Sequence, residues 1–334
     1  MKKILVIHNK YRHLGGEDVA VESEINILKE NYDVRVVYFE NKIENILKQT
    51  VAFVLNSNYK SNSRVLNALN EFNPDLVYIH NTWFKASLGI FNLITEQKKE
   101  VVIKLHNFRY FCTRSYFSSK HFSEENKCNA CGLSRDDIGI LNNYFKGSII
   151  KSFLMNRYGK KYFQIIKSRK IKKIVLTNFH KQFLANLGIN KSVEVIPNFI
   201  TTNNVENIFE EEDYIVYAGR VSEEKGVEEL IDAYLGSEIT YLKLKIIGDG
   251  PILQKLKNKY KNENIDFLGE IKNKNALSLI KSSKAVVTAT KLFEGQPTLL
   301  CEAASLEVPS IFPRSGGIEE FFPDSYKLSF EQFN

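Results

Sequence analysis

The sequence predicts an α/β protein with two doubly wound parallel sheets, one in each half of the chain. Apolar, β-branched segments alternate almost throughout with helix-like segments, a pattern typical of parallel sheets. The 334 residues are enough for two domains, each with its own core. A turn-rich, polar stretch at 196–204 separates the halves, so we place an N-terminal domain at 1–197 and a C-terminal domain at 198–334.

The expected strands follow from apolar runs that are bounded by turn residues. In the first half these runs lie at 3–8, 34–39, 76–80, 101–106, 173–177 and 193–196. In the second half they lie at 214–218, 242–247, 265–268, 285–290 and 310–312, with a last strand-like piece at 326–330. An α/β domain normally closes with another helix, so we expect the C-terminal domain to be truncated.

Composition excludes several classes of protein. Hydrophobic residues make up 43% of the chain and charged residues 25%, as in globular proteins. The apolar run after Met1 is too short for a signal peptide, and no uncharged apolar stretch approaches the length of a membrane span. Four cysteines without an export signal indicate a reducing compartment, so we expect a cytoplasmic protein.

Residues 107–145 interrupt the alternation and are expected to form an insertion in the first domain. The stretch is aromatic and polar, and it holds three of the four cysteines. Cys128 and Cys131, with Cys112 upstream, have half the spacing of a structural zinc site. No fourth ligand is obvious apart from His121, so free thiols remain the alternative and we predict no metal.

A strongly basic stretch follows the insertion. Between residues 146 and 173 there are ten Lys or Arg residues and no acid, with apolar residues interleaved. Such a helix can rest on an anionic membrane surface, or it can pack on the core with a solvated basic face. No recognised nucleic-acid motif accompanies the charge, so a nucleic-acid partner is not expected.

Two acids in the second half bracket the start of an expected helix. Glu294 lies on the loop after the strand at 285–290, and Glu302 follows eight positions later. Pro297 between them is expected in the first helical turn, with Leu299, Leu300, Ala303, Ala304 and Leu306 forming an apolar stripe. Unpaired N–H groups at such a helix start bind phosphate. A ligand with hydroxyls at both ends and phosphate between them, such as a nucleotide sugar, suits this arrangement.

Two further strand ends in the second half carry glycine-rich loops. Gly219 opens the loop after the strand at 214–218, where Arg220 and Lys225 offer charges for phosphate oxygens. Gly248 and Gly250 follow the next strand and allow a close approach to a ligand. Each loop alone is equally compatible with an ordinary turn.

In the first half, the loop after the first strand ends in Gly15 and Gly16, which can present N–H groups to a pyrophosphate. Their spacing is not that of a dinucleotide-binding fingerprint. His80 and His106 each end an expected strand, where ligands bind in this architecture. A Gly-x-Ser-x-Gly elbow and a Gly-Lys-Ser/Thr phosphate loop are absent from the sequence, which disfavours hydrolases and ATPases.

Taken together, the motifs at 219–226, 248–251 and 294–303 resemble those of the family 4 glycosyltransferases of the GT-B fold. The segments 80–83 and 106–109 are similar to those of a bacterial branch involved in capsule, O-antigen and exopolysaccharide assembly. The resemblance implies two Rossmann-like domains facing a central cleft. It also implies a retaining, metal-independent hexosyltransferase with a UDP- or GDP-sugar donor and a lipid-linked glycan acceptor at the inner face of the cell membrane.

The resemblance also implies roles for single residues. Arg220 and Lys225 would hold the pyrophosphate, Glu294 the sugar hydroxyls and Glu302 the ribose, while His106 would lie beside the sugar. Backbone and loop contacts to the donor would come from Gly15, Gly16, Gly219, Gly248, Gly295, Gln296, Pro297, Thr298 and Leu299.

Two departures from the family pattern stand out. Gln296 replaces a common Phe, which would alter sugar selectivity, and a cysteine near Tyr144 is missing, which weakens the zinc hypothesis. The rival interpretations are a catalytically silent nucleotide-sugar-binding protein and another GT-B reaction, such as epimerisation or phosphorolysis.

Overall fold

The computed structural model describes residues 1–11, 15–41, 45–111, 149–200, 202, 205, 213–237, 239 and 241–332. The chain divides into two compact units, Met1–Phe199 and Ile200–Asn334. This division falls two residues after the boundary expected at 197/198. Most of the expected insertion, with Cys112, Cys128 and Cys131, lies outside the described residues, and so does the zinc hypothesis.

The first unit contains a six-stranded parallel sheet with the order β2-β1-β3-β4-β5-β6. Its strands are β1 (Lys3–Lys10), β2 (Asp33–Glu40), β3 (Leu76–Asn81), β4 (Glu100–Leu105), β5 (Ile171–Val175) and β6 (Val193–Val195). All six expected strands are therefore confirmed, with shifts at their ends. Strand β4 ends at Leu105, so His106 lies just beyond the strand rather than inside it.

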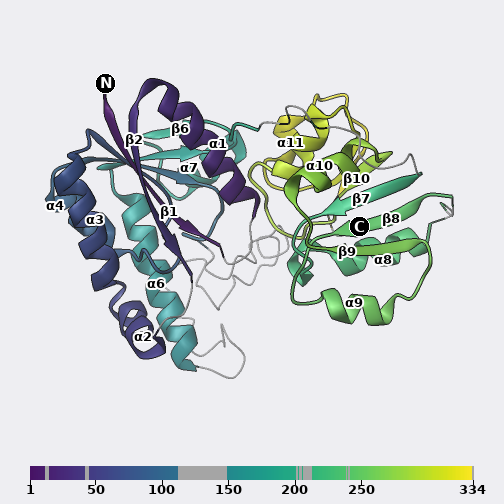
Figure 1. The fold of residues 1–334 in the computed structure, drawn as a ribbon, viewed down its shortest axis with the longest axis horizontal. Coiled ribbons are helices and arrows are strands. Elements are labelled where there is room, and N and C mark those ends of the chain that lie inside the picture. The colour runs from purple at the N-terminus through teal and green to yellow at the C-terminus, as the bar shows by residue number, and fades with distance from the viewer. Residues whose placement is uncertain are drawn as a thin grey trace. The chain divides into compact units, whose positions relative to one another are not determined.

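Helices cover both faces of this sheet, which explains why its strands are almost uniformly apolar. They are α1 (Gly16–Asn31), α2 (Ile46–Leu55), α3 (Tyr59–Phe72), α4 (Gly89–Glu96), α6 (Ile149–Lys167) and α7 (Asn178–Asn186). Figure 1 shows α3 and α4 on one side of the sheet and α1 on the other. Val21 and Ile25 of α1 pack against Ile4 and Val6 of β1 in one buried cluster.

Polar side chains define where three of these helices begin. The side chains of Asn45, Asn58 and Thr177 accept hydrogen bonds from the N–H groups three residues later, at the starts of α2, α3 and α7. Each bond satisfies one of the N–H groups that a helix start leaves without an intrahelical acceptor. These local caps keep the helix starts, and therefore the loops before them, at defined positions.

The second unit also contains a six-stranded sheet, with the order β12-β11-β10-β7-β8-β9. Its strands are β7 (Tyr214–Ala218), β8 (Lys243–Ile247), β9 (Ile265–Gly269), β10 (Ala285–Val287), β11 (Ser310–Arg314) and β12 (Ser329–Glu331). Its helices are η1 (Glu223–Lys225), α8 (Val227–Leu235), α9 (Leu253–Lys259), α10 (Asn273–Lys281), α11 (Thr298–Ser305) and η2 (Ile318–Phe321). The paired strands are parallel throughout, which confirms the α/β prediction for this half.

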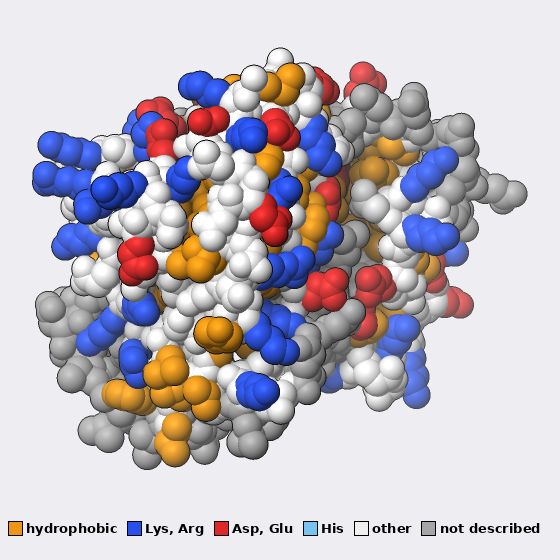
Figure 2. All heavy atoms as spheres, turned by 60° about the vertical axis from the view of Figure 1, so that its left-hand side comes forward, with side chains coloured by type: hydrophobic (Ala, Val, Ile, Leu, Met, Phe, Trp, Pro, Cys, Tyr) orange, Lys and Arg blue, Asp and Glu red, His pale blue; other side chains and the backbone are white. Residues whose placement is uncertain are grey.

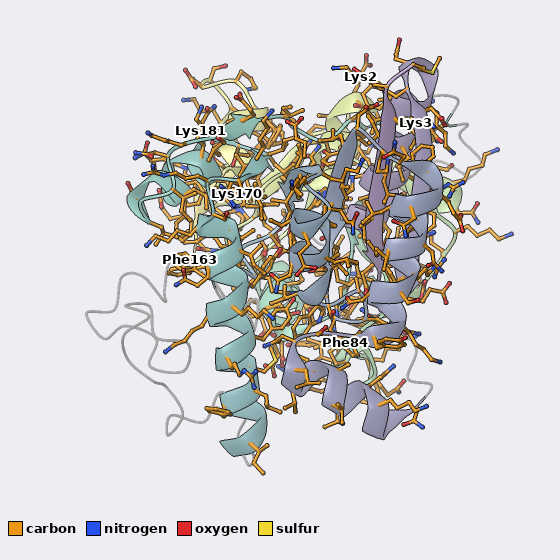
Figure 3. All side chains as sticks on the ribbon, turned by 90° about the vertical axis from the view of Figure 1, so that its left-hand side faces the viewer. Lys2, Lys3, Phe84, Phe163, Lys170 and Lys181 are labelled. Atoms are coloured by element: carbon orange, nitrogen blue, oxygen red, sulfur yellow. The ribbon has the colours of Figure 1, made fainter. Side chains whose placement is uncertain are left out.

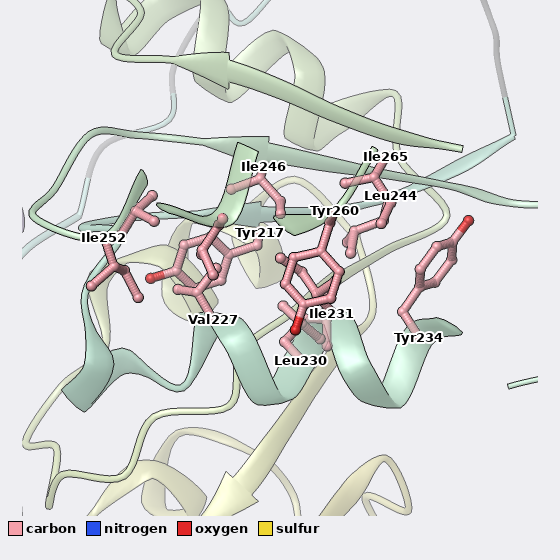
Figure 4. Close-up of a cluster of buried hydrophobic side chains, with 13 residues drawn as sticks. Tyr217, Val227, Leu230, Ile231, Tyr234, Leu244, Ile246, Ile252, Tyr260 and Ile265 are labelled. Atoms are coloured by element: carbon pink, nitrogen blue, oxygen red, sulfur yellow. The ribbon is translucent and has the colours of Figure 1, made fainter. Parts of the chain in front are cut away.

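Two buried clusters occupy the faces of the second sheet. Figure 4 shows one of them, in which Val227, Leu230 and Ile231 of α8 pack against strand residues such as Ile246. The other cluster joins α10 and α11 to Tyr214 and to neighbouring strand residues. Because the core lies beneath the sheet faces, the loops at the carboxyl ends of the strands remain accessible for ligands.

Helix α6 carries the basic stretch along the side of the first unit (Figure 3). Its buried residues include Met155, Tyr158, Tyr162, Phe163 and Ile166. Its exposed residues include Ile150, Phe153, Arg157, Gln164 and Lys167. The helix therefore packs one face on the core and exposes another that carries both basic and apolar side chains. No helix in the described parts of the chain is long and apolar enough to cross a bilayer.

Candidate functional site

The loops after β7 and β8 lie against each other in the second unit. The N–H of Gly219 donates to the carbonyl of Ile247 at 2.9 Å, and the N–H of Val221 donates to Asp249 O at 3.0 Å. A Cβ atom on Gly248 would lie 1.9 Å from Gly219 O, and one on Gly250 would lie 2.1 Å from Val221 O. These two glycines are thus required because the two loops approach each other closely. This requirement does not depend on a ligand.

A third glycine ties the loop after β7 to the segment after β10. Gly226 has φ +67°, and a Cβ atom there would lie 2.0 Å from the carbonyl oxygen of Ala289. The N–H of Lys291 donates to Glu224 O at 3.0 Å across the same contact. This docking brings Lys225, at the end of η1, to the loop that carries Glu294.

Lys225 and Glu294 form an ion pair between these two loops. The Thr290 hydroxyl donates to the same carboxylate oxygen at 3.0 Å, and the Gly317 N–H donates to the carbonyl of Glu294 at 3.0 Å. The side chains of Lys225 and Glu294 are 31% and 22% exposed, respectively. Both charges are therefore held in place while remaining accessible to a ligand. Sequence reasoning missed Thr290, although its position at the end of an expected strand pointed to this edge.

Arg220 extends from the same loop into solvent. Its side chain is exposed, and it makes no hydrogen bond or ion pair within the described parts of the chain. Its carbonyl oxygen accepts a hydrogen bond from the Tyr217 hydroxyl at 2.8 Å, which fixes the backbone beneath it. The guanidinium is thus available for an anion on the side of the sheet where Lys225 lies.

The helix after Glu294 differs in two details from the sequence prediction. Pro297 is the N-cap of α11 with extended backbone (φ −74°, ψ 102°), so it precedes the helix rather than lying in its first turn. Leu300 and Ala303 are buried, but Ala304 is exposed, so the apolar stripe is narrower than predicted. Leu299 and Leu306 are partly buried and pack against the same cluster, so Ala304 is the residue of the predicted stripe that faces solvent.

Glu302 lies in the second turn of α11 and is partly buried. Burial raises the pKa of its carboxyl group to about 7. The carboxyl group of Glu302 makes no hydrogen bond or ion pair with any residue that the structure describes. A carboxylate in this situation is stabilised by hydroxyl donors from a ligand.

Nearby, Gly295 is buried, and Nε2 of Gln296 lies 3.7 Å from Sγ of Cys301. The N–H groups of Thr298 and Leu299 open the helix.

In the first unit, the structure brings together the two histidines that end neighbouring strands. Nδ1 of His80 lies 3.0 Å from Nε2 of His106, and the rings are stacked. Burial, followed by neighbouring positive charge, holds the pKa of both imidazoles well below the usual range. The pair is therefore neutral, and buried Nδ1 of His106 has no partner within the described residues.

Gly15 and Gly16 lie at the start of α1, beside two acids. The N–H of Gly15 donates to a carboxylate oxygen of Asp18 at 3.1 Å, so it is already engaged. The other oxygen of Asp18 lies 2.8 Å from Nε2 of His8. Glu17 accepts a hydrogen bond from the Tyr11 hydroxyl at 2.9 Å. The glycine pair is thus part of a buried polar network that the sequence did not reveal.

A pocket at the carboxyl ends of β3 and β4 lies wholly within the first unit. Its lining is His80, Asn81, Thr82, Trp83, Lys104, Leu105, His106, Asn107, Arg109, Tyr158 and Tyr162. His106 was expected there, whereas Arg109 and Trp83 were not assigned a role from the sequence. Both lie within three residues of the strand-end histidines, and this proximity was the available signal.

Comparisons with known proteins agree with this geometry. Residues 198–333 match the family model of group 1 glycosyl transferases. The chain is 25% identical over 173 residues to the amylovoran biosynthesis glycosyltransferase AmsD of Erwinia amylovora, and this match covers 48% of each chain. It is 26% identical over 301 residues to an uncharacterised glycosyltransferase of Methanocaldococcus jannaschii, covering 83% of this chain and 63% of that one. The matches thus span about half to two thirds of these relatives' lengths.

Solved structures show that the fold is GT-B. The structure of Anabaena Alr3699/HepE in complex with UDP and glucose has a TM-score of 0.63 at 16% identity, over 100% of this chain and 87% of that one. WaaG, a glycosyltransferase involved in lipopolysaccharide biosynthesis, has a TM-score of 0.63 at 14% identity, over 95% of this chain and 83% of that one. At these identities the likeness establishes the architecture alone.

Proposed function

We propose that this chain transfers a sugar from a nucleotide-diphosphate sugar to a glycan acceptor, because residues 198–333 match the family model of group 1 glycosyl transferases. The observation that carries the proposal is the Lys225–Glu294 pair, with Arg220 on one side and the start of α11 on the other. Cations, a carboxylate and helix N–H groups at one sheet edge match the chemistry of such a donor.

The proposed roles follow the order of groups along the donor. Arg220 and Lys225 neutralise the diphosphate as it leaves, and the N–H groups at Thr298 and Leu299 bind its distal phosphate. Glu294 accepts hydrogen bonds from sugar hydroxyls, and Glu302 accepts them from the ribose. On donor binding, Lys225 exchanges its bond to Glu294 for phosphate oxygens. Two cations and a helix N-terminus supply the stabilisation that a metal ion provides elsewhere, so the reaction is proposed to be metal-independent.

For the first unit we propose a role beside the transferred sugar. His106, neutral and with Nδ1 unpartnered among the described residues, can donate to a sugar hydroxyl. Because Asp18 already accepts the Gly15 N–H, the phosphate contact at the start of α1 is proposed for the backbone of exposed Gly16. Retention of anomeric configuration is proposed on the resemblance to family 4, with a donor phosphate oxygen receiving the acceptor proton.

The acceptor is proposed to be a lipid-linked surface glycan. In support, one relative is named for amylovoran biosynthesis and one structural neighbour for lipopolysaccharide biosynthesis. Figure 2 shows Lys and Arg side chains spread over one face of the first unit, with hydrophobic side chains gathered at its lower edge. Exposed Ile150 and Phe153 on α6, with Arg157 and Lys167, give that helix an outer face suited to an anionic membrane.

The function is tested with purified protein, UDP- and GDP-sugars labelled in the sugar, and detergent-solubilised lipid extracts as acceptors. Label appearing in the lipid fraction, with release of the nucleoside diphosphate, is the expected result. An epimerised donor without transfer would assign another GT-B reaction, and binding without turnover would assign a silent binding protein.

The membrane contact is tested separately by sedimentation with liposomes. Wild-type protein should bind vesicles that contain phosphatidylglycerol in preference to neutral vesicles, and high salt should release it because screening weakens the attraction. Changing Arg157, Lys167 and Lys170 together to Glu should abolish this binding and leave nucleotide affinity intact. Equal binding of wild type and variant would contradict the assignment.

A further inference from the structure

Arg109 lies just after β4, on the pocket of the first unit that His80 and His106 line. Its backbone N–H donates to the Asn107 side chain at 3.0 Å, which fixes the start of this segment. Its guanidinium carbon lies 5.0 Å from the centre of the Trp83 ring and 6.0 Å from that of Tyr11. The side chain is therefore held between aromatic groups on the pocket wall.

The guanidinium has unused hydrogen-bond donors. Nε and Nη1 of Arg109 are buried, and neither has a hydrogen-bond partner in the described parts of the chain. An arginine remains charged under all ordinary conditions, so this charge cannot be removed by loss of a proton. Buried N–H groups without an acceptor are unfavourable, and proteins retain such groups where a ligand completes their contacts.

Glu17 is the acid that interacts electrostatically with Arg109, but its carboxylate is engaged elsewhere. Its oxygen accepts hydrogen bonds from the Tyr11 hydroxyl at 2.9 Å and from the Asn107 amide at 3.3 Å. Burial raises the pKa of Glu17, which favours its neutral form, although Arg109 and His8 oppose this shift. Glu17 therefore does not satisfy the two N–H groups of Arg109.

Other polar atoms of the same pocket are also unpartnered. Nδ1 of His106, Nε2 of His80 and the Thr82 hydroxyl are buried, and none has a hydrogen-bond partner among the described residues. Each neutral imidazole carries one N–H, and one of these two protons lies in the bond between the rings, so one free ring nitrogen donates and the other accepts. The Thr82 hydroxyl can do either. The pocket thus combines one planar, charged donor fork with neutral groups that donate or accept.

We propose that Arg109 binds an oxyanion of the acceptor, either a carboxylate or a phosphate group, in this pocket. The inference rests on the proposed function and narrows the acceptor to an anionic glycan or glycan phosphate. A guanidinium fork with two free N–H groups matches the paired oxygens of these anions, whereas a neutral sugar offers no negative charge to the guanidinium.

Trp83 provides a local probe, because it is the only tryptophan in the chain and lies on Arg109. Its fluorescence is followed during titration with methyl glucuronide, glycerol 3-phosphate, inorganic phosphate or, as the neutral match, methyl glucoside. A saturable change with methyl glucuronide assigns a uronate carboxylate, and one with glycerol 3-phosphate assigns a phosphate ester. Equal affinity for methyl glucoside, binding of inorganic phosphate alone, or no response to any anion would overturn the proposal.

Variants test whether the fluorescence change on anion binding depends on Arg109. Arg109→Gln should weaken anion binding at least tenfold, and Arg109→Lys should recover part of it because the charge remains. Arg64→Gln, an exposed arginine on α3, is the matched control and should bind as the wild type does. Unchanged anion affinity in a folded Arg109→Gln protein would overturn the assignment. UDP binding, measured by calorimetry, should be equal in wild type and Arg109→Gln, and its absence in both would contradict the proposed function alone.

Discussion

The candidate sites of the two units differ in the exposure and pairing of their charged and titratable side chains. In the second unit, Lys225 and Glu294 pair with each other and stay partly exposed, and Arg220 reaches into solvent. In the first unit, His80 is buried, His106 is partly buried, and the pKa of both imidazoles is held well below the usual range, while Arg109 keeps two buried N–H groups without a partner among the described residues.

This difference indicates how each site can work. A partly exposed ion pair contributes little to stability, so its members can exchange partners when a charged ligand arrives. Buried groups are held in one protonation state by their surroundings and respond to a ligand through hydrogen bonds. The second unit is thus suited to neutralising a diphosphate, and the first to binding one anionic group at Arg109 among neutral hydrogen-bonding groups.

The largest effect is expected from removing the exposed cations. Arg220→Ala or Lys225→Ala should lower kcat/KM on the order of a hundredfold or more, since each removes a charge-assisted contact of about 3 kcal/mol from the transition state. Steady-state kinetics with the identified donor measures this loss. Lys284→Ala, at a lysine that precedes β10 and pairs with Asp213, is the control and should keep its activity. Wild-type turnover in both variants would rule out the diphosphate role.

The next effect concerns the stability of the first unit. Lys104 has a side chain that is 1% exposed and pairs with Glu24 at 2.9 Å. Glu24→Ala should lower the free energy of unfolding by about 2 kcal/mol, because it leaves the buried ammonium with only the Pro197 carbonyl, at 3.4 Å, as an acceptor. Adding Lys104→Met should recover much of the loss. Urea unfolding followed by Trp83 fluorescence measures both.

Surface ion pairs in the second unit test whether burial explains the stability loss expected for Glu24→Ala. Glu228 binds Lys255 at 2.8 Å and Lys259 at 2.9 Å on the surface, and Glu228→Ala should change stability less than Glu24→Ala does. An equal or larger loss from Glu228→Ala would mean that burial does not distinguish the two kinds of pair.

A third prediction separates the two acids of the second unit. If Glu302 binds ribose, Glu302→Ala should weaken UDP binding about tenfold, an effect of about 1.4 kcal/mol. Glu294→Ala should spare UDP affinity and lower the rate of sugar transfer. Calorimetry with UDP, alongside the transfer assay, gives both quantities. The reverse division between the variants would mean that the ends of the donor are assigned in the wrong order.

The smallest effect is an opposite pH dependence of the two sites. The pKa of Glu302 is about 7 in the folded state and about 4.5 when unperturbed, so its stabilising contribution is lost as the pH rises between these values. The pKa of His80 is held well below 6.5, so the unfolded chain takes up protons first and stability is lost as the pH falls below 6.5.

Urea unfolding at pH 5 and pH 8 tests these signs. Relative to the wild type, Glu302→Gln should gain stability at pH 8 compared with pH 5. His80→Gln should gain stability at pH 5 compared with pH 8. A variant whose difference from the wild type stays constant with pH would show that the residue does not titrate as its burial predicts.

Much of the second site could be predicted because its motifs are contiguous. Glu294 and Glu302 lie on one loop and the helix that follows, and Arg220 and Lys225 lie on one strand–helix loop. The first site could be predicted only in part. His80 and His106 mark strand ends, but Arg109, Trp83 and Glu17 belong to segments whose meeting depends on strand order.

The sequence by itself determined the alternation of strands and helices, the parallel sheets and the residues at the strand ends, because these follow from periodicity and turn chemistry over a few positions. Tertiary structure alone decided that Lys225 meets Glu294, since this contact requires Gly226 to dock on Ala289. It also decided that Arg109 keeps two unpaired donors beside Trp83. Contacts between distant loops depend on which strands are neighbours, and local patterns do not encode that order.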